Sequence, residues 1–60
     1  MKRREIIKML EDNGFILKRN GANHDIYWNS LTKKTVPVGR HREIDDDLAK
    51  EIFKEAGIKP

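Results

Sequence analysis

The feature that most constrains the fold is that this chain of 60 residues contains no cysteine. Disulfides and thiolate-bound metals, which commonly reinforce very small domains, are therefore excluded, and so is a thiol nucleophile. A domain of this size buries only about 60% of the surface that its unfolded chain exposes. We therefore expect one domain, or a piece of one, built around a single thin apolar core.

Two segments have the spacing of amphipathic helices. The first covers residues 2–13 and is followed by Gly14, which is placed to end it in a left-handed conformation. The second covers residues 45–56, with Asp45 as its N-cap and Gly57 as its C-terminal cap. The apolar positions are Ile6, Ile7, Met9 and Leu10 in the first segment, and Leu48, Ala49, Ile52, Phe53 and Ala56 in the second.

Three short β-rich runs lie between the helices, at residues 15–19, 24–28 and 35–38. The first turn contains Gly21, which can adopt a positive φ. Pro37 cannot donate a ladder hydrogen bond, so the third run is expected at a sheet edge. Short connections favour an antiparallel meander.

The predicted fold is α+β, in the order α-β-β-β-α, with a three-stranded antiparallel sheet and two helices on one face. The other face of the sheet would be open to a partner. Tyr27 and Trp28 point to opposite sides of the second strand, and alternation groups His24 with Ile26 and Trp28. The sequence leaves open which of the two aromatic residues is exposed.

Charge is unevenly distributed along this basic chain, whose formal net charge is +3. Between Lys18 and Arg42 there are six lysines or arginines and one acid, Asp25. From Glu43 onward the sequence has six acids and three lysines. A basic middle suits an anionic partner such as nucleic acid. Composition alone is equally compatible with a small domain that has a lysine-rich surface.

No stretch of the chain has the character of a membrane anchor or a leader. No apolar run approaches the roughly 20 residues that a membrane span requires. Residues 1–4 are basic, but Glu5 and Lys8 place charges in the segment after them, so no signal-peptide core is present. We therefore expect no membrane association and a cytoplasmic protein.

Several motifs, taken in order, resemble those of HicA-type toxins, the mRNA interferases. The first helix closes on Glu11-x-x-Gly14-Phe15, and a Gly21-Ala22-Asn23-His24 turn joins two strands. The third run leads into a basic stretch and the chain closes on a last helix, with the sequences Thr35-Val36-Pro37-Val38, Arg42-Glu43-Ile44 and Ile52-Phe53-Lys54-Glu55-Ala56-Gly57-Ile58. The similarity covers nearly the whole chain.

The resemblance implies that residues 1–60 are a single toxin domain with a fold like that of double-stranded-RNA-binding domains. It implies the toxin of a type II toxin–antitoxin system acting in stress responses, an endoribonuclease that cleaves mRNA without a metal or other cofactor. It further implies an antitoxin of the HicB type, with a toxin that is monomeric alone and hetero-oligomeric with its antitoxin.

The resemblance also selects His24 as the catalytic residue, because the essential histidine of the family follows a glycine and two small or polar residues. This chain departs from the pattern at two points. Ala22 and Asn23 stand where many relatives have serine, and Asp25 follows His24 where many relatives have a second histidine.

Histidine suits this chemistry because the 2′-hydroxyl of RNA is an internal nucleophile. The protein must take its proton, or give one to the leaving 5′-oxygen, and an unperturbed imidazole with a pKa near 6.5 can do either at neutral pH. A positioned acid or base of this kind contributes on the order of 10²–10⁴ in rate. Without the family resemblance, a single histidine at the start of a strand is more often structural or simply exposed.

Phosphate contacts are expected from the basic residues of the middle of the chain. The candidates are Lys18, Arg19, Lys33, Lys34, Arg40 and Arg42. Trp28 would stack on a base if its face is open. His41, between two arginines, is interpreted as a solvated loop residue that could contact RNA. Asp45, Asp46 and Asp47 are explained by the helix N-terminus rather than by a cation site.

Two other functions remain open from the sequence. The first is a non-catalytic RNA-binding module of the same fold, for which Lys33 and Lys34 would matter and His24 would not. The second is a protein-interaction domain that docks a partner on the open sheet face or on the acidic last helix.

Overall fold

The computed structural model describes residues 1–59. The elements follow the predicted order: α1 (Arg3–Asp12), β1 (Phe15–Asn20), β2 (His24–Asn29), β3 (Thr35–Gly39) and α2 (Asp46–Ala56). The strands form one antiparallel sheet in the order β1-β2-β3. Pro37 therefore lies in an edge strand, as predicted.

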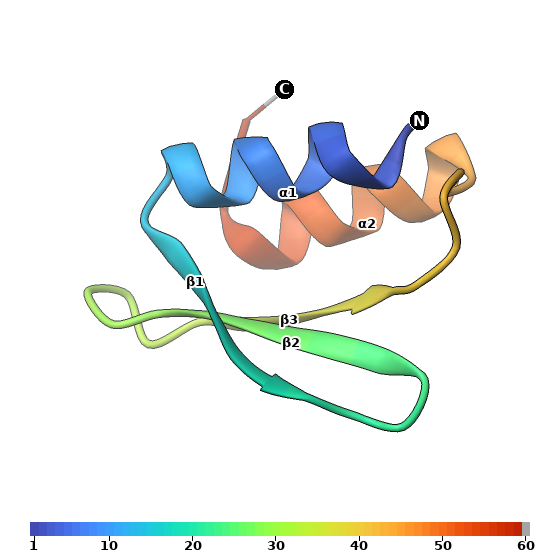
Figure 1. Cartoon of the computed structure of the whole chain (residues 1–60). Helices are drawn as coiled ribbons and strands as arrows, with labels where there is room; N and C mark the ends of the chain where they lie inside the picture. The colour runs from blue at the N-terminus through green and yellow to red at the C-terminus, as the bar shows by residue number, and fades with distance from the viewer. Residues whose placement is uncertain (60) are drawn as a thin grey trace.

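Both helices cover the same face of the sheet, with α1 and α2 side by side above the strands (Figure 1). No helix formed by residues 1–59 covers the opposite face of the sheet. The hairpin formed by β1 and β2 extends beyond the helices, and its turn lies at the far end of the sheet (Figure 1). The predicted α+β architecture is confirmed.

The core lies between the sheet and the two helices. Its largest fully buried side chains come from α1, β1 and β3, and they are Ile6, Leu10, Phe15, Val36 and Val38. The expected stripe of α2 is correct at Ala49, Ile52, Phe53 and Ala56. It is wrong at Leu48, which is 54% exposed. Leu48 is one residue, or about 100° of helix rotation, before Ala49, so it lies beyond the edge of the buried stripe.

The helix ends follow the local signals in the sequence. The Asp45 carboxylate caps α2 by accepting from the Asp47 backbone N–H at 3.2 Å. Asp46 and Asp47 occupy its first turn, where the helix dipole favours negative charge. Gly14 and Gly57 both take positive φ after the helices, at 89° and 75°. The three adjacent acids are thus explained by capping, as predicted.

The sequence suggested a positive φ at Gly21, and the structure does not show one. Within residues 1–59 the glycines with positive φ are Gly14 and Gly57. The turn needs glycine for another reason. A Cβ at position 21 would lie 2.6 Å from the carbonyl oxygen of His24, which is closer than real Cβ atoms approach. The Gly21 N–H donates to that same oxygen at 2.8 Å. Close approach of two backbones, rather than a left-handed conformation, requires a residue without a side chain.

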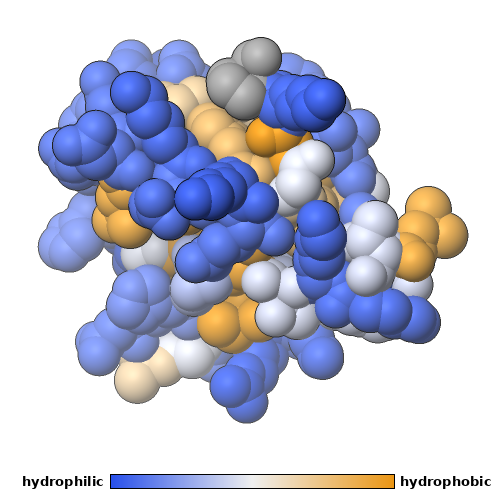
Figure 2. Space-filling model, turned by 180° about the vertical axis from the view of Figure 1, so that it is seen from behind, coloured by the Kyte–Doolittle hydropathy of each residue, from blue (hydrophilic) through white to orange (hydrophobic). Residues whose placement is uncertain are grey.

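The face opposite to that of Figure 1 is predominantly hydrophilic (Figure 2). On the face opposite to that of Figure 1, hydrophobic residues are exposed only in separate patches between hydrophilic ones (Figure 2). None of the helices formed by residues 1–59 is long and apolar enough to cross a membrane.

Candidate functional site

The strand β2 presents one face to the core and one to solvent, and this resolves the question of its two aromatic residues. Tyr27 is 7% exposed and packs in the core. Burial raises the pKa of its hydroxyl. His24, Ile26 and Trp28 alternate with Tyr27 and therefore lie on the face of the sheet that no helix covers. We call this the open face.

His24 is exposed at the first position of β2. Its partner across the sheet is Gly39, the last residue of β3. Because Gly39 has no side chain, the flank of the imidazole is not covered there. A Cβ at position 39 would lie 3.9 Å from the His24 Cδ2 atom, an ordinary contact distance. The ring is accordingly accessible to a ligand on the open face.

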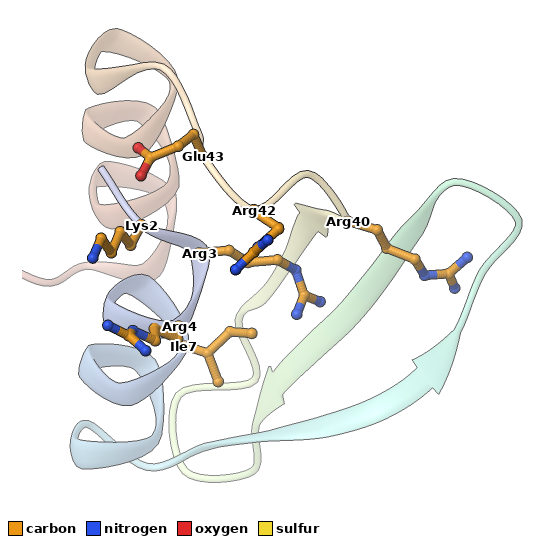
Figure 3. Close-up of a pocket in the computed structure, with 7 residues that line it drawn as sticks. All are labelled: Lys2, Arg3, Arg4, Ile7, Arg40, Arg42 and Glu43. Carbon is orange, nitrogen blue, oxygen red and sulfur yellow. The ribbon is translucent and has the colours of Figure 1, made fainter.

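The turn before His24 is held by Arg40, whose guanidinium reaches from the end of β3 toward the hairpin (Figure 3). It donates to the carbonyl oxygens of Ala22, at 2.9 Å, and of Gly21. It also donates to the Asp25 carboxylate at 2.9 Å and 3.1 Å. One side chain thus binds residues on both sides of His24 and fixes the turn on which the histidine stands.

Asp25 lies between two arginines on the helix side of the sheet. Its second carboxylate oxygen accepts from Arg3 Nη2 at 2.6 Å, and Arg3 Nε donates to the carbonyl oxygen of Gly39 at 2.7 Å. The hydrogen bond from Arg40, together with the charges of both arginines, lowers the pKa of Asp25 although partial desolvation opposes this. Asp25 is therefore an ionised anchor for the hairpin.

On the open face, Trp28 is surrounded by basic side chains. The Nζ atoms of Lys18 and Lys33 lie 5.3 Å and 5.8 Å from its ring centroid, within cation–π range. Arg19 lies opposite Ile26 in the sheet register and so belongs to the same face. Three of the six predicted phosphate ligands therefore share a face with His24.

Lys33 is presented by a tight loop between β2 and β3. The side-chain oxygen of Asn29, a residue only 5% exposed, accepts from the backbone N–H groups of Leu31 and Thr32 at 2.9 Å and 3.3 Å. The Asn29 amide donates to the Asn13 carbonyl at 2.9 Å. Lys33 itself has a φ of 64°, so the loop curls back sharply at this residue.

The other predicted phosphate ligands lie elsewhere. Lys34 points toward the end of α2, where its Nζ fills the space that a Cβ on Gly57 would occupy. Arg40 is engaged by the hairpin turn through the contacts given for it. Arg42 lies in the loop before α2, across a cleft from the first turn of α1 (Figure 3). The charge pattern groups these residues with Lys18, Arg19 and Lys33, whereas the fold places Lys34 beside the end of α2 and both Arg40 and Arg42 at the cleft.

A family model described as the HicA toxin of bacterial toxin–antitoxin systems matches residues 3–58. The chain belongs to the HicA toxin family. No curated protein and no solved structure gave a match. As a HicA toxin, the protein is one component of a toxin–antitoxin system, and its family assignment implies an antitoxin partner.

Sequence reasoning missed Arg3 as a residue that contacts both neighbours of His24 in the sheet, Asp25 and Gly39. In the sequence, the basic residues at the start of the chain bear only on the question of a leader, whereas Arg3 contacts Asp25 and Gly39. These contacts span 22 and 36 positions, so no local pattern indicates them. The one signal in the sequence is an excess of cations near an otherwise isolated acid.

Residues 1–59 contain no cluster of side chains that could hold a metal ion. No three histidine or carboxylate side chains of this part of the chain gather as a metal site requires.

Proposed function

We propose that this HicA toxin is an endoribonuclease that cleaves mRNA, with His24 as its general acid or base. The observation that carries the proposal is the position of the His24 imidazole. It is exposed on the open face, on a turn that Arg40 holds from two sides, and it shares that face with Lys18 and Lys33.

The reaction needs no metal because RNA supplies its own nucleophile. The 2′-oxygen attacks the adjacent phosphorus, the bond from phosphorus to the 5′-oxygen breaks, and a 2′,3′-cyclic phosphate forms. His24 takes the proton of the 2′-hydroxyl or gives a proton to the departing 5′-oxygen, and solvent water exchanges the other proton. Cations on the same face stabilise the negative charge that develops on the phosphoryl oxygens.

The open face is suited to a single strand of RNA. His24 and Trp28 are four residues apart on an extended strand, a separation of about 13 Å. A base can stack on the indole of Trp28 while the backbone runs toward the imidazole. Arg19 lies between these two positions in the register, and Lys18 and Lys33 flank the indole.

The proposed activity also defines the proposed partner. A toxin that cuts mRNA in the cytoplasm must be stored inactive, and an antitoxin of the HicB type would do this by covering the open face. Acidic groups on that antitoxin would accelerate capture by electrostatic attraction to the lysines and arginines of the face.

Expression in bacterial cells tests the proposal. The wild-type protein is expected to arrest growth and to lower the amount of intact mRNA, and His24→Ala is expected to abolish both effects. His41→Ala is the matched control, because His41 is the other histidine and is also exposed; this variant should remain toxic.

Unchanged toxicity of His24→Ala would refute the catalytic assignment. RNA that is bound but never cleaved by the wild-type protein would instead indicate a non-catalytic RNA-binding module of the same fold.

A further inference from the structure

A basic cleft lies outside the open face, between the first turn of α1 and the loop that joins β3 to α2 (Figure 3). Its volume is about 640 Å³, within the range of ligand sites in proteins. Five cationic side chains line it, from Lys2, Arg3, Arg4, Arg40 and Arg42. We call it the α1 cleft. Arg3, at the start of α1, is shared with the site described above, where it contacts Asp25 and Gly39.

The acids near the α1 cleft are already paired. Asp25 is bound by Arg3 and Arg40, at 2.6 Å and 2.9 Å. Glu43, the one acid in the lining, lies 3.6 Å from the Met1 amino group. Among the described residues no ion pair involves Lys2, Arg4 or Arg42. Three cations therefore face one cavity without an acid to compensate them.

The two walls of the cleft are joined by backbone hydrogen bonds. The Arg3 N–H donates to the Arg42 carbonyl at 2.9 Å, and Lys2 pairs with Glu43 in an isolated antiparallel bridge. Next to this bridge, the Ile44 N–H donates to the Met1 carbonyl at 2.8 Å. The cations are thus held on a fixed frame before any ligand arrives, which reduces the entropy lost on binding.

We propose that the α1 cleft binds the phosphate backbone of the RNA strand at a point outside the cleavage site. This inference rests on the proposed function and adds an anchoring subsite to it. Arginine guanidinium groups match phosphate oxygens in a two-pronged geometry. Ile7 is the one apolar residue of the lining, and the other six lining residues are charged. A phosphodiester backbone requires only charge and hydrogen-bond donors.

The cleft is linked to His24 through Arg40. This side chain lines the cleft, and its guanidinium also holds the carbonyl oxygens of Gly21 and Ala22 in the turn before the histidine. A strand bound in the cleft would therefore leave it beside the hairpin that presents the imidazole. Binding and cleavage would use adjacent parts of one strand.

The test is the salt dependence of RNA binding, measured with a single-stranded oligouridine in a His24→Ala background that prevents cleavage. The slope of log K against log salt is negative, and each lost phosphate contact reduces its magnitude by about 0.7 for single strands. The variant K2Q/R4Q/R42Q should reduce the magnitude by about 2 and weaken binding at least about tenfold at physiological salt. R42Q alone should reduce the magnitude by about 0.7.

The matched control is K8Q/K50Q/K59Q, which removes the same charge from exposed positions outside the cleft. Its slope should stay near that of the parent protein. Equal slopes for the cleft variant and this control would overturn the proposal. Oligoglutamate provides a second check. If it competes with RNA for the parent protein and binds the cleft variant as much more weakly as RNA does, the proposal is overturned in favour of an acidic protein partner.

Cleavage is measured separately with His24 intact. The cleft variant should have a raised KM for RNA, with kcat within about threefold of the wild-type value, because the reacting groups are unchanged. If the wild-type protein does not cleave RNA, the proposed function fails, and the salt slopes still decide whether the α1 cleft binds a strand. If cleavage occurs and the slopes do not change, only the cleft proposal fails.

Discussion

His24 and Asp25 are neighbours in the sequence and lie on opposite faces of the sheet. The imidazole is exposed on the open face, whereas the carboxylate accepts hydrogen bonds from Arg3 and Arg40 on the helix side. The acid that distinguishes this chain from the usual family pattern therefore does not point at the phosphate that His24 would meet. Its charge is used to anchor the hairpin.

The role of Asp25 predicts a specific loss of stability in acid. The arginines lower the pKa of Asp25 in the folded protein, so the stabilisation is complete above the unfolded value of about 3.9 and is lost as the pH falls through the folded value. The difference in Tm between the wild-type protein and Asp25→Asn should be constant from pH 7 to about 5 and shrink below about pH 4. Thermal unfolding followed by circular dichroism measures it. If plots of Tm against pH for the two proteins stay parallel down to about pH 2, this role of Asp25 is contradicted.

Arg40 is expected to act as a positioning residue. Arg40→Ala removes the donors that fix the turn, and kcat at saturating RNA should fall about tenfold, consistent with a small displacement of a reacting group. The free energy of unfolding should fall by only about 1 kcal/mol, because the side chain is 43% exposed and water screens its ion pair.

Arg40→Lys provides the control for charge. It keeps the cation but loses the planar fork that reaches three acceptors, so kcat should be restored only in part. Full activity of Arg40→Ala at saturating RNA would show that the turn does not need this residue.

Two glycines beside His24 should respond differently to alanine. A Cβ on Gly21 would lie 2.6 Å from the His24 carbonyl oxygen, so Gly21→Ala must shift the backbone and should cost about 1–3 kcal/mol. A Cβ on Gly39 makes an ordinary 3.9 Å contact with the imidazole, so Gly39→Ala should change stability by less than about 1 kcal/mol. Urea denaturation distinguishes the two, and equal losses would show that the turn tolerates a side chain.

Trp28 is the only tryptophan in the chain and lies on the open face, so its fluorescence reports on that face. Titration with single-stranded RNA should quench it. Trp28→Ala should weaken binding by about 1–3 kcal/mol if one base stacks there, and Trp28→Phe should lose less because an aromatic face remains. Saturable binding without any change in fluorescence would place the RNA elsewhere.

The order of the elements was predictable because its signals are local. Gly14, Gly57 and Asp45 mark helix ends through their own backbone and capping chemistry, and Pro37 marks an edge strand. The exposed face of β2 was not predictable from the same kind of signal. Alternation gives two sets of residues, and only the packing of Tyr27 beneath the helices decides which set is buried.

The contacts that hold the hairpin beside His24 were not predictable for a different reason. Arg40 and Asp25 are 15 positions apart, and Arg3 and Asp25 are 22 apart. Their contacts depend on how the start of α1 and the end of β3 meet beside the hairpin. A charge pattern along the sequence cannot show this, and it therefore groups Arg40 with the cations proposed to bind RNA and overlooks Arg3.

The central claim is that His24 performs the chemistry, and the most direct measurement is RNA cleavage by the purified protein in the presence of a metal chelator. The wild-type protein should cut a single-stranded RNA and leave 2′,3′-cyclic phosphate ends. His24→Ala should bind the same RNA with similar affinity and cut it at least about 10²-fold more slowly. Cleavage by His24→Ala at the wild-type rate would contradict the claim.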